Sequence, residues 1–222
     1  MPVHQITYDS ARSLIYEFLK QVTDAGETIG LGGTIAREDL YAQASTRVPG
    51  TIGWYCFNFE DRISSLPSFF MAFETNAVDY EPTPSSCINE VLYFSGSAFT
   101  YNGEVSPQGV DYFLQSQEQI PGTTSDISDD DVELCMDYFL GNYPAGERNP
   151  YAESCCAFFN ADELNEFLNQ SENYPYVRYL LGFDDSHPNQ KIRLILMPVD
   201  ANGYNVTSNV IMLQHSWPPY ST

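Results

Sequence analysis

The sequence predicts an α+β protein built by internal duplication. Three observations lead to this prediction. Two segments carry apolar residues at the spacing of an amphipathic helix, pairs of strand-like segments follow one another closely enough to form hairpins, and the order of these segments in the first half recurs in the second. Hairpin strands pair antiparallel, so we expect antiparallel sheets with helices packed on one face and the two copies packed as a pseudo-dimer.

Each copy is expected to contain helix, strand, helix, strand, strand and strand, in that order. Residues 1–100 form the first repeat, residues 101–125 a connector with a short helix, and residues 126–222 the second repeat. Identity between the copies is low, so the prediction depends on the order of the elements, their spacing and the phase of the helices.

The first helix of each copy is indicated by its apolar spacing. Residues 9–22 place apolar side chains on one helical face, and residues 129–143 repeat this phase. Ile6 and Ile127 precede the two helices at equivalent positions. The apolar residues are Ala11, Leu14, Ile15, Phe18, Leu19 and Val22 in the first helix, and Val132, Cys135, Met136, Phe139 and Leu140 in the second.

A short apolar strand and a second helix are expected next in each copy. The strands are IGLGGTIA and ESCCAFF, and the helices lie in TIAREDLYAQAS and FFNADELNEFLNQS, which place Leu40 opposite Leu164. Asn160 can cap the later helix, with Glu163 at the third helical position.

Two hairpin strands and a last strand complete each copy. IGWYCFNFED corresponds to YVRYLLGFDD, with Tyr55 opposite Tyr179, and FFMAFETNAV corresponds to ILMPVDANGY, with Met71 opposite Met197. KIRLILMPVD is apolar on both faces, which is typical of a central strand or one covered on both sides. The last strands are INEVLYFSG and NVIMLQHSW. In the connector, Ser106-Pro107 is expected to open a helix, and PGTTSD breaks the chain after it.

The acidic strand ends raise the question of a metal site. LLGFDD and its counterpart CFNFED both end a strand before a hairpin, so we interpret their acids as strand ends that face water. As an alternative, Asp184, Asp185 and Asp200 could converge across neighbouring strand ends and bind Ca²⁺ or Mg²⁺ weakly. DANGYN lacks the spacing of a calcium loop, and its Asn-Gly pair favours a turn.

No catalytic residue and no cofactor are predicted, which favours a non-enzymatic protein and leaves the question of an enzyme open. The three histidines show no zinc-site spacing, and phosphate-loop, dinucleotide-binding and serine-hydrolase motifs are absent from the sequence. The five cysteines fit neither a disulfide framework nor a zinc site, which favours buried free thiols.

The charge limits the partners. A formal net charge of −21 with two lysines repels nucleic acid and acidic membranes, and it favours basic proteins or cations. No apolar run is long enough to cross a membrane, and the N-terminus lacks a signal-peptide pattern. We therefore expect a cytoplasmic protein.

The second half resembles a group of small, functionally unassigned proteins from Bacteroidota that are about one copy long. The matching stretches are ISDDDVELCMDYF, FFNADELNEFL, YVRYLLGFDD, LILMPVDANG and SWPPYST, within residues 127–222. The resemblance implies no catalytic residue. The cysteines associated with the tail of that group are missing here.

The sequence as a whole favours an acidic, non-enzymatic protein that binds a protein partner or self-associates into an oligomer. Two alternatives remain: an acidic decoy or inhibitor that occupies a nucleic-acid-binding protein, and a metal-dependent hydrolase that uses the strand-end carboxylates. The decoy requires carboxylates spaced like phosphates along one face, and the hydrolase requires Asp184, Asp185 and Asp200 to meet in a pocket.

Overall fold

The computed structural model describes residues 5–25, 30–44, 50–58, 68–74, 92–95, 98–122, 124–127, 156–186 and 192–215. These residues form four helices and eleven strands. The helices are α1 (Tyr8–Ala25), α2 (Arg37–Ala44), α3 (Pro107–Ser116) and α5 (Ala161–Leu168). The strands are β1 (Gln5–Ile6), β2 (Gly30–Ala36), β3 (Gly50–Asn58), β4 (Ser68–Glu74), β5 (Leu92–Ser95), β6 (Ala98–Thr100), β7 (Thr124–Ile127), β8 (Cys156–Asn160), β9 (Tyr176–Phe183), β10 (Ile192–Val199) and β11 (Met212–His215).

The strands form two sheets. The six-stranded sheet has the order β1-β11-β10-β9-β2-β6, and the five-stranded sheet has the order β7-β5-β4-β3-β8. Every pairing between the described strands is antiparallel. Helices and antiparallel sheets together confirm the α+β class.

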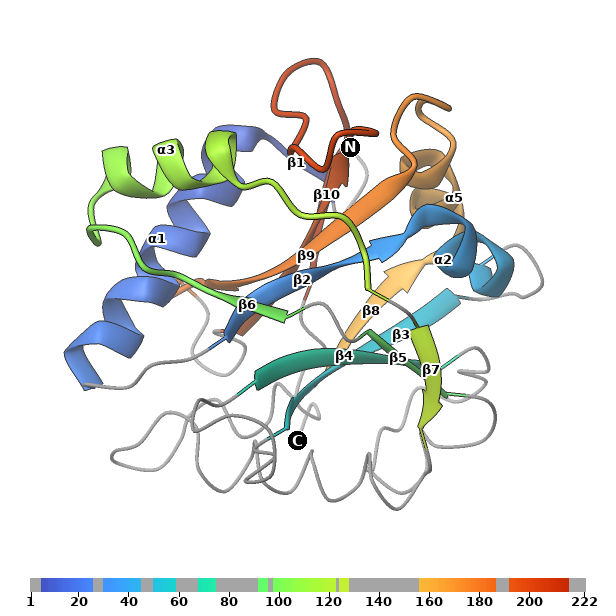
Figure 1. Ribbon diagram of the computed structural model, residues 1–222, viewed down its shortest axis with the longest axis horizontal. Coiled ribbons are helices and arrows are strands. Elements are labelled where there is room, and N and C mark those ends of the chain that lie inside the picture. Colours follow the sequence, from blue (N-terminus) through green and yellow to red (C-terminus); the bar gives the residue numbers. More distant parts are fainter. Residues whose placement is uncertain are drawn as a thin grey trace.

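The six-stranded sheet lies between helices and the other sheet. Figure 1 shows α1 and α3 above it and the five-stranded sheet below it. Helix α1 contacts β9, α3 contacts α1, and strands β2 and β6 contact β4 of the other sheet. Because both faces are covered, the side chains of residues 177–183 in β9 and 193–199 in β10 are all buried. The expectation of a strand covered on both sides is confirmed for β10.

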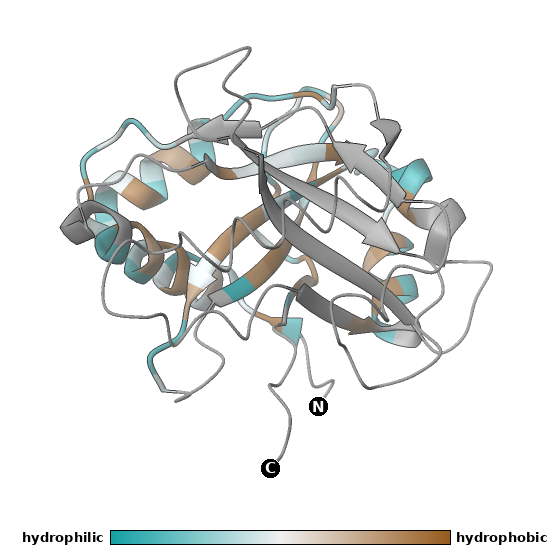
Figure 2. Cartoon of the chain, turned by 90° about the horizontal axis from the view of Figure 1, so that it is seen from below, coloured by the Kyte–Doolittle hydropathy of each residue, from teal (hydrophilic) through white to brown (hydrophobic). Residues whose placement is uncertain are grey.

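Helix α1 turns its apolar stripe toward the six-stranded sheet. Ala11, Ile15 and Phe18 are at most 1% exposed, as the spacing predicted. Gly182 in β9 permits close packing, because a Cβ at this position would lie 2.9 Å from the Cβ of Leu14. Figure 2 shows hydrophobic and hydrophilic residues alternating along the helices, as expected for helices that pack on one side only.

The start of the helix expected at Ser106-Pro107 is confirmed, and the helix ends at Ser116. Pro107 begins α3, and the Ser106 hydroxyl accepts a hydrogen bond from the Gly109 amide at 3.0 Å, which caps the helix. Val110 and Leu114 are fully buried beneath it. The helix expected at residues 129–143 lies outside the described residues, as do the side chains of the cysteines.

The two sheets share one strand order when the halves of the chain are interchanged. The order β1-β11-β10-β9-β2 becomes β7-β5-β4-β3-β8 if each strand is replaced by its counterpart in the other half. Strands β1 and β7 were not predicted, and they correspond through the matched positions Ile6 and Ile127. Strand β2 therefore pairs with β9 of the later half, and β8 pairs with β3 of the earlier half. Each sheet thus contains strands from both halves.

The hairpin registers differ by one residue from the sequence alignment. Tyr55 faces Met71, whereas Tyr179 faces Leu196 and Met197 faces Arg178. The order of strands is shared between the sheets, but the residue pairs proposed from sequence do not occupy equivalent positions in the two hairpins.

Among the described residues, no helix combines the length and the apolar character that crossing a lipid bilayer requires.

Candidate interaction surface

A buried arginine marks the centre of the six-stranded sheet. Arg178 lies in β9 within an apolar run, and it is 0% exposed. A guanidinium in this position is costly unless its N–H groups find acceptors, because burial removes its hydration. The surrounding segments supply these acceptors.

Neutral oxygens from several segments surround the Arg178 guanidinium. Nη1 donates to Thr34 Oγ1 at 2.6 Å and to Gln119 Oε1 at 3.1 Å. Nη2 donates to the Gly203 carbonyl at 2.6 Å and to the Gln117 carbonyl at 3.4 Å, and Nε donates to Asn205 Oδ1 at 3.1 Å. Burial lowers the pKa of Arg178 to about 10, so the group remains cationic at neutral pH.

This network fixes the segment after α3 against the β10–β11 loop. Thr34 Oγ1 donates to Gln119 Oε1 at 2.8 Å, and Asn205 Nδ2 donates to the Leu114 carbonyl at 2.6 Å. Gly203 has a positive φ of 89°, and a Cβ there would lie 2.9 Å from the backbone of Gln119. The turn predicted at DANGYN is confirmed, because the Gly203 amide bonds to the Asp200 carbonyl at 3.0 Å.

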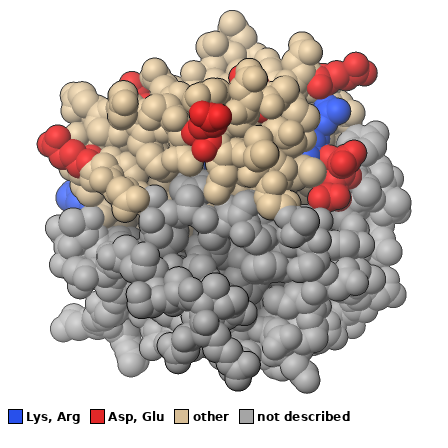
Figure 3. Space-filling view, in the orientation of Figure 1, with Lys and Arg blue, Asp and Glu red and all other residues tan. Residues whose placement is uncertain are grey.

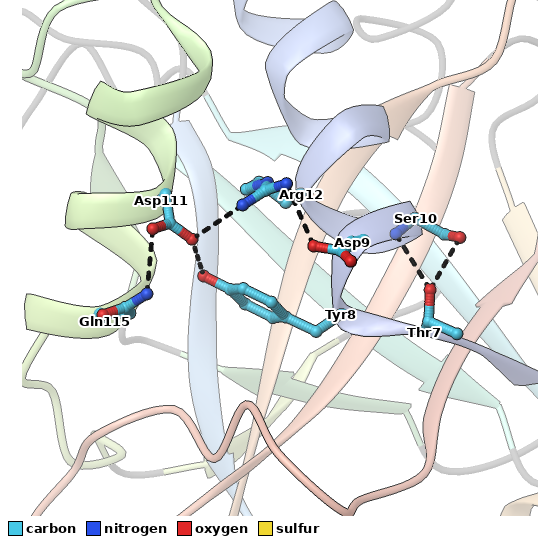
Figure 4. A network of polar contacts seen from close by, with 7 residues as sticks. All are labelled: Thr7, Tyr8, Asp9, Ser10, Arg12, Asp111 and Gln115. Carbon is cyan, nitrogen blue, oxygen red and sulfur yellow. Dashed lines mark hydrogen bonds and ion pairs between the residues drawn. The ribbon is translucent and has the colours of Figure 1, made fainter.

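Helix α3 is held to α1 by a second polar network, drawn in Figure 4. Tyr8 Oη and Arg12 Nη1 donate to Asp111 Oδ1 at 2.8 and 3.3 Å, and Gln115 Nε2 donates to Asp111 Oδ2 at 3.0 Å. These contacts, the Tyr8 hydrogen bond foremost, hold the pKa of Asp111 below its usual value. Burial together with the Asp111 contact raises the pKa of Tyr8. The connector is therefore anchored at both ends.

Large apolar side chains are exposed on this anchored segment and on the β10–β11 loop that is bridged to it. Tyr112, Ile120 and Tyr204 are 75%, 60% and 36% exposed. Glu118 and Tyr204 form an isolated β-bridge, and Tyr204 Oη donates to Glu118 Oε2 at 2.8 Å. We name Tyr112, Glu118, Ile120 and Tyr204 the connector face. Large apolar side chains exposed on a rigid segment are typical of protein-binding surfaces.

An open groove is lined in part by the last residues of the β10–β11 loop. It has a volume of about 630 Å³ between the end of α5 and the segment that enters β11. The side chain of Gln170 joins these two walls. Its Nε2 donates to the Ile211 carbonyl at 3.1 Å, and its Oε1 accepts from the Ile211 amide at 2.7 Å.

Asp184 lies directly after the end of β9, as the sequence predicted, but its side chain is only 24% exposed and forms an ion pair instead of facing water. Arg193 Nη2 donates to Asp184 Oδ2 at 3.0 Å, and the Ser186 amide donates to Oδ1 at 3.0 Å. Burial acts to raise the pKa of Asp184, but the contacts with Ser186 and Arg193 outweigh it and lower the pKa. Asp185 follows as an exposed residue.

The three candidate metal ligands do not converge. Asp184 follows the β9 end at which Phe183 pairs with Ile192, and Asp200 follows the opposite end, at which Val199 pairs with Tyr176. Seven residue steps separate these ends, or about 24 Å at about 3.4 Å per residue. Asp200 Oδ1 instead accepts from the Asn202 and Tyr204 amides at 2.8 and 3.0 Å. Within the described residues, no group of three His, Cys, Asp or Glu side chains could hold a metal ion.

Acidic side chains are dispersed over the described part of the face in Figure 3. They occur singly or in small groups, among few Lys and Arg side chains. The described part of this face does not present the regular row of carboxylates that a decoy for a nucleic-acid-binding protein requires.

Sequence reasoning overlooked Arg178 and its partners. The available signal was a cation within the apolar run YVRYLLGF, in a chain with only nine Lys and Arg. Its acceptors could not be found in this way, because they come from segments that are distant in the sequence. No family model, curated protein or solved structure matches the chain.

Proposed function

We propose that this chain is an acidic, non-enzymatic protein that binds a basic protein partner through the connector face. The exposure of Tyr112 and Ile120 on a doubly anchored segment, and of Tyr204 on the loop bridged to it, is the observation that carries the proposal. An anchored surface loses little conformational entropy on binding, so its exposed apolar area contributes efficiently to affinity.

Charge supports a basic partner over a second copy of the chain. Two copies would each bring a formal charge of −21, and their repulsion opposes self-association. A cationic partner is attracted by the same field. Glu118 on the connector face would contact a Lys or Arg beside the apolar anchors.

The hydrolase alternative is not favoured by the geometry of the described residues. It requires Asp184 and Asp200 in one pocket, and the antiparallel hairpin separates them. Asp184 is engaged by Arg193, and Asp200 is engaged in its own turn.

The test compares a variant of the connector face with a matched control. Partners captured by the purified chain are purified in turn, and their affinities are measured. Tyr112→Ser, Ile120→Ser and Tyr204→Ser combined should weaken binding of a basic partner at least about tenfold, since each anchor is worth about 1 kcal/mol or more. The control, Tyr16→Ser on α1, should bind like the wild type.

Two results would contradict this function. One is an unchanged affinity of the triple variant for every purified partner. The other is a defined oligomer of the wild-type chain in light scattering that the triple variant loses, which would identify self-assembly as the role of the connector face.

We further propose that the chain is a fused duplication in which the halves exchange their first strands. The shared strand order supports this: β1 and β2 join the sheet of β9, β10 and β11, while β7 and β8 join the sheet of β3, β4 and β5. The resemblance of residues 127–222 to proteins one copy long agrees with it. Such an arrangement would make each half depend on the other for a complete sheet.

Cleavage of the folded chain tests the exchange. A protease site inserted after Pro121 would be cut once the intact chain has folded. The two fragments should then stay together in size-exclusion chromatography and separate only in denaturant. Fragments that separate under native conditions and keep their circular dichroism would contradict the exchange.

A further inference from the structure

Side-chain hydrogen bonds brace the two walls of the groove between α5 and β11. The amide of Gln170 bonds to both backbone groups of Ile211, and its Nε2 also donates to the Phe167 carbonyl at 2.9 Å. Asn209 adopts a positive φ of 56°, a conformation that asparagine tolerates better than most residues. A groove fixed in this way binds with a small entropic cost.

The groove presents acceptors of hydrogen bonds and negative charge. Glu166 contributes a carboxylate, of which Oε2 accepts from Gln5 Nε2 at 3.0 Å. Asn169, Asn209 and Tyr174 add amide oxygens and a phenol ring. Among the described residues, seven line the groove, and none of these seven is cationic.

The end of α5 adds to this negative character. Carbonyl groups at a helix C-terminus carry a partial negative charge, which favours cations. Arg37 already binds the Leu168 and Ser171 carbonyls at 3.0 Å, but it is not one of the lining residues. The groove itself therefore remains suited to a positively charged group.

We propose that the groove binds an extended, Lys- or Arg-bearing segment of the basic partner, an inference that rests on the proposed function. The cationic head would bond to the Glu166 carboxylate and lie near the Tyr174 ring. Its aliphatic stem would cover Val210 and Ile211. Tyr204 lies in the same loop as Asn209, so one partner would contact both the groove and the connector face.

The test uses short arginine-containing peptides with neutral spacers, titrated into the full chain by calorimetry. Glu166→Gln should weaken binding about tenfold, because it removes a charge-assisted hydrogen bond. Glu172→Gln removes the same charge from an exposed residue outside the groove, and it should change the affinity by less than about twofold. Tyr174→Ser provides a second groove variant.

Three outcomes would overturn the proposal. The first is an equal loss of peptide affinity in Glu166→Gln and Glu172→Gln, which would indicate attraction by net charge alone. The others are no binding of the peptides, or binding of a neutral oligosaccharide in their place. The triple variant of the connector face separates the two proposals. If the groove proposal is correct, this variant still binds the peptides. If only the groove proposal fails, partner binding still depends on the connector face.

Discussion

The two ends of the β9–β10 hairpin each contain a buried or nearly buried arginine, but they satisfy it differently. At one end, Arg193 is 6% exposed and forms an ion pair with Asp184. At the other, Arg178 is fully buried and donates to neutral oxygens of Thr34, Gln119, Asn205 and two backbone carbonyls. At the first end the arginine is paired with a carboxylate nearby in the sequence, and at the second it is hydrogen-bonded to segments that are distant in the sequence.

This difference shows why the strand end at Asp184 could be predicted from the sequence, whereas the hydrogen-bond network of Arg178 could not. Asp184 and Arg193 are nine residues apart, within one hairpin. The partners of Arg178 span residues from Thr34 to Asn205. A local contact follows from a predicted hairpin, whereas a network of distant segments follows only from their packing.

Replacing Arg178 should have the largest effect. Arg178→Met would remove the donor of five hydrogen bonds in the interior, and we expect a loss of about 3–5 kcal/mol in the free energy of unfolding, measured in urea. Arg178→Lys should lie between this variant and the wild type, because an ammonium cannot reproduce the planar fork. The control Arg12→Met, at an ion pair whose side chains are 34% and 32% exposed, should cost less than about 1 kcal/mol. If Arg178→Met lowers the free energy of unfolding by less than Arg12→Met does, Arg178 does not join the connector to the sheet.

Breaking the ion pair at the other end should have a smaller effect. Asp184→Asn should reduce the free energy of unfolding by about 1–2 kcal/mol at neutral pH, because Asp184 is partly solvated. The folded-state pKa of Asp184 is lowered, so its stabilisation is present above the unfolded pKa of about 3.9 and is lost as the pH falls through the folded value. The variant and the wild type should therefore converge in acid. A difference that is independent of pH would indicate that packing, and not charge, explains the loss.

The turn at Asp200 should be the least sensitive of the three positions. Asp200→Ala removes an acceptor for the Asn202 and Tyr204 amides, and we expect a loss of about 1 kcal/mol. Asp200→Asn keeps an oxygen in place and should cost less. These values would be measured by thermal unfolding with and without millimolar Ca²⁺. A calcium-dependent stabilisation that both substitutions abolish would show that Asp200 ligates calcium after all.

Much of the element order was predictable because it depends on local patterns. The spacing of Ala11, Ile15 and Phe18 predicted α1, and Ser106-Pro107 predicted the start of α3. The alternation in KIRLILMPVD predicted a strand buried on both faces. The residues that make up each of these signals lie close together in the sequence, so the signals can be recognised without knowledge of the fold.

Pairing between the halves was beyond these patterns. The sequence places β2 next to α2 and β3, but the structure pairs it with β9. Both locations offer an apolar strand a hydrogen-bonding edge, and only the complete packing decides between them. The register also differs. Aligning the two halves of the sequence placed Met71 and Met197 in equivalent positions, whereas the strand pairing of the two hairpins offsets them by one residue.

The sequence by itself determined the α+β class, the connector helix, the buried strands and a strongly acidic chain. Local hydrophobic periodicity, capping chemistry and charge are sufficient for these features. Only the tertiary structure decided that Asp184 and Asp200 lie at opposite ends of a hairpin, that Arg178 joins the connector to the sheet, and that Ile120 and Tyr204 are exposed. These features depend on which distant segments pack together, and a pattern read along the chain does not contain that information.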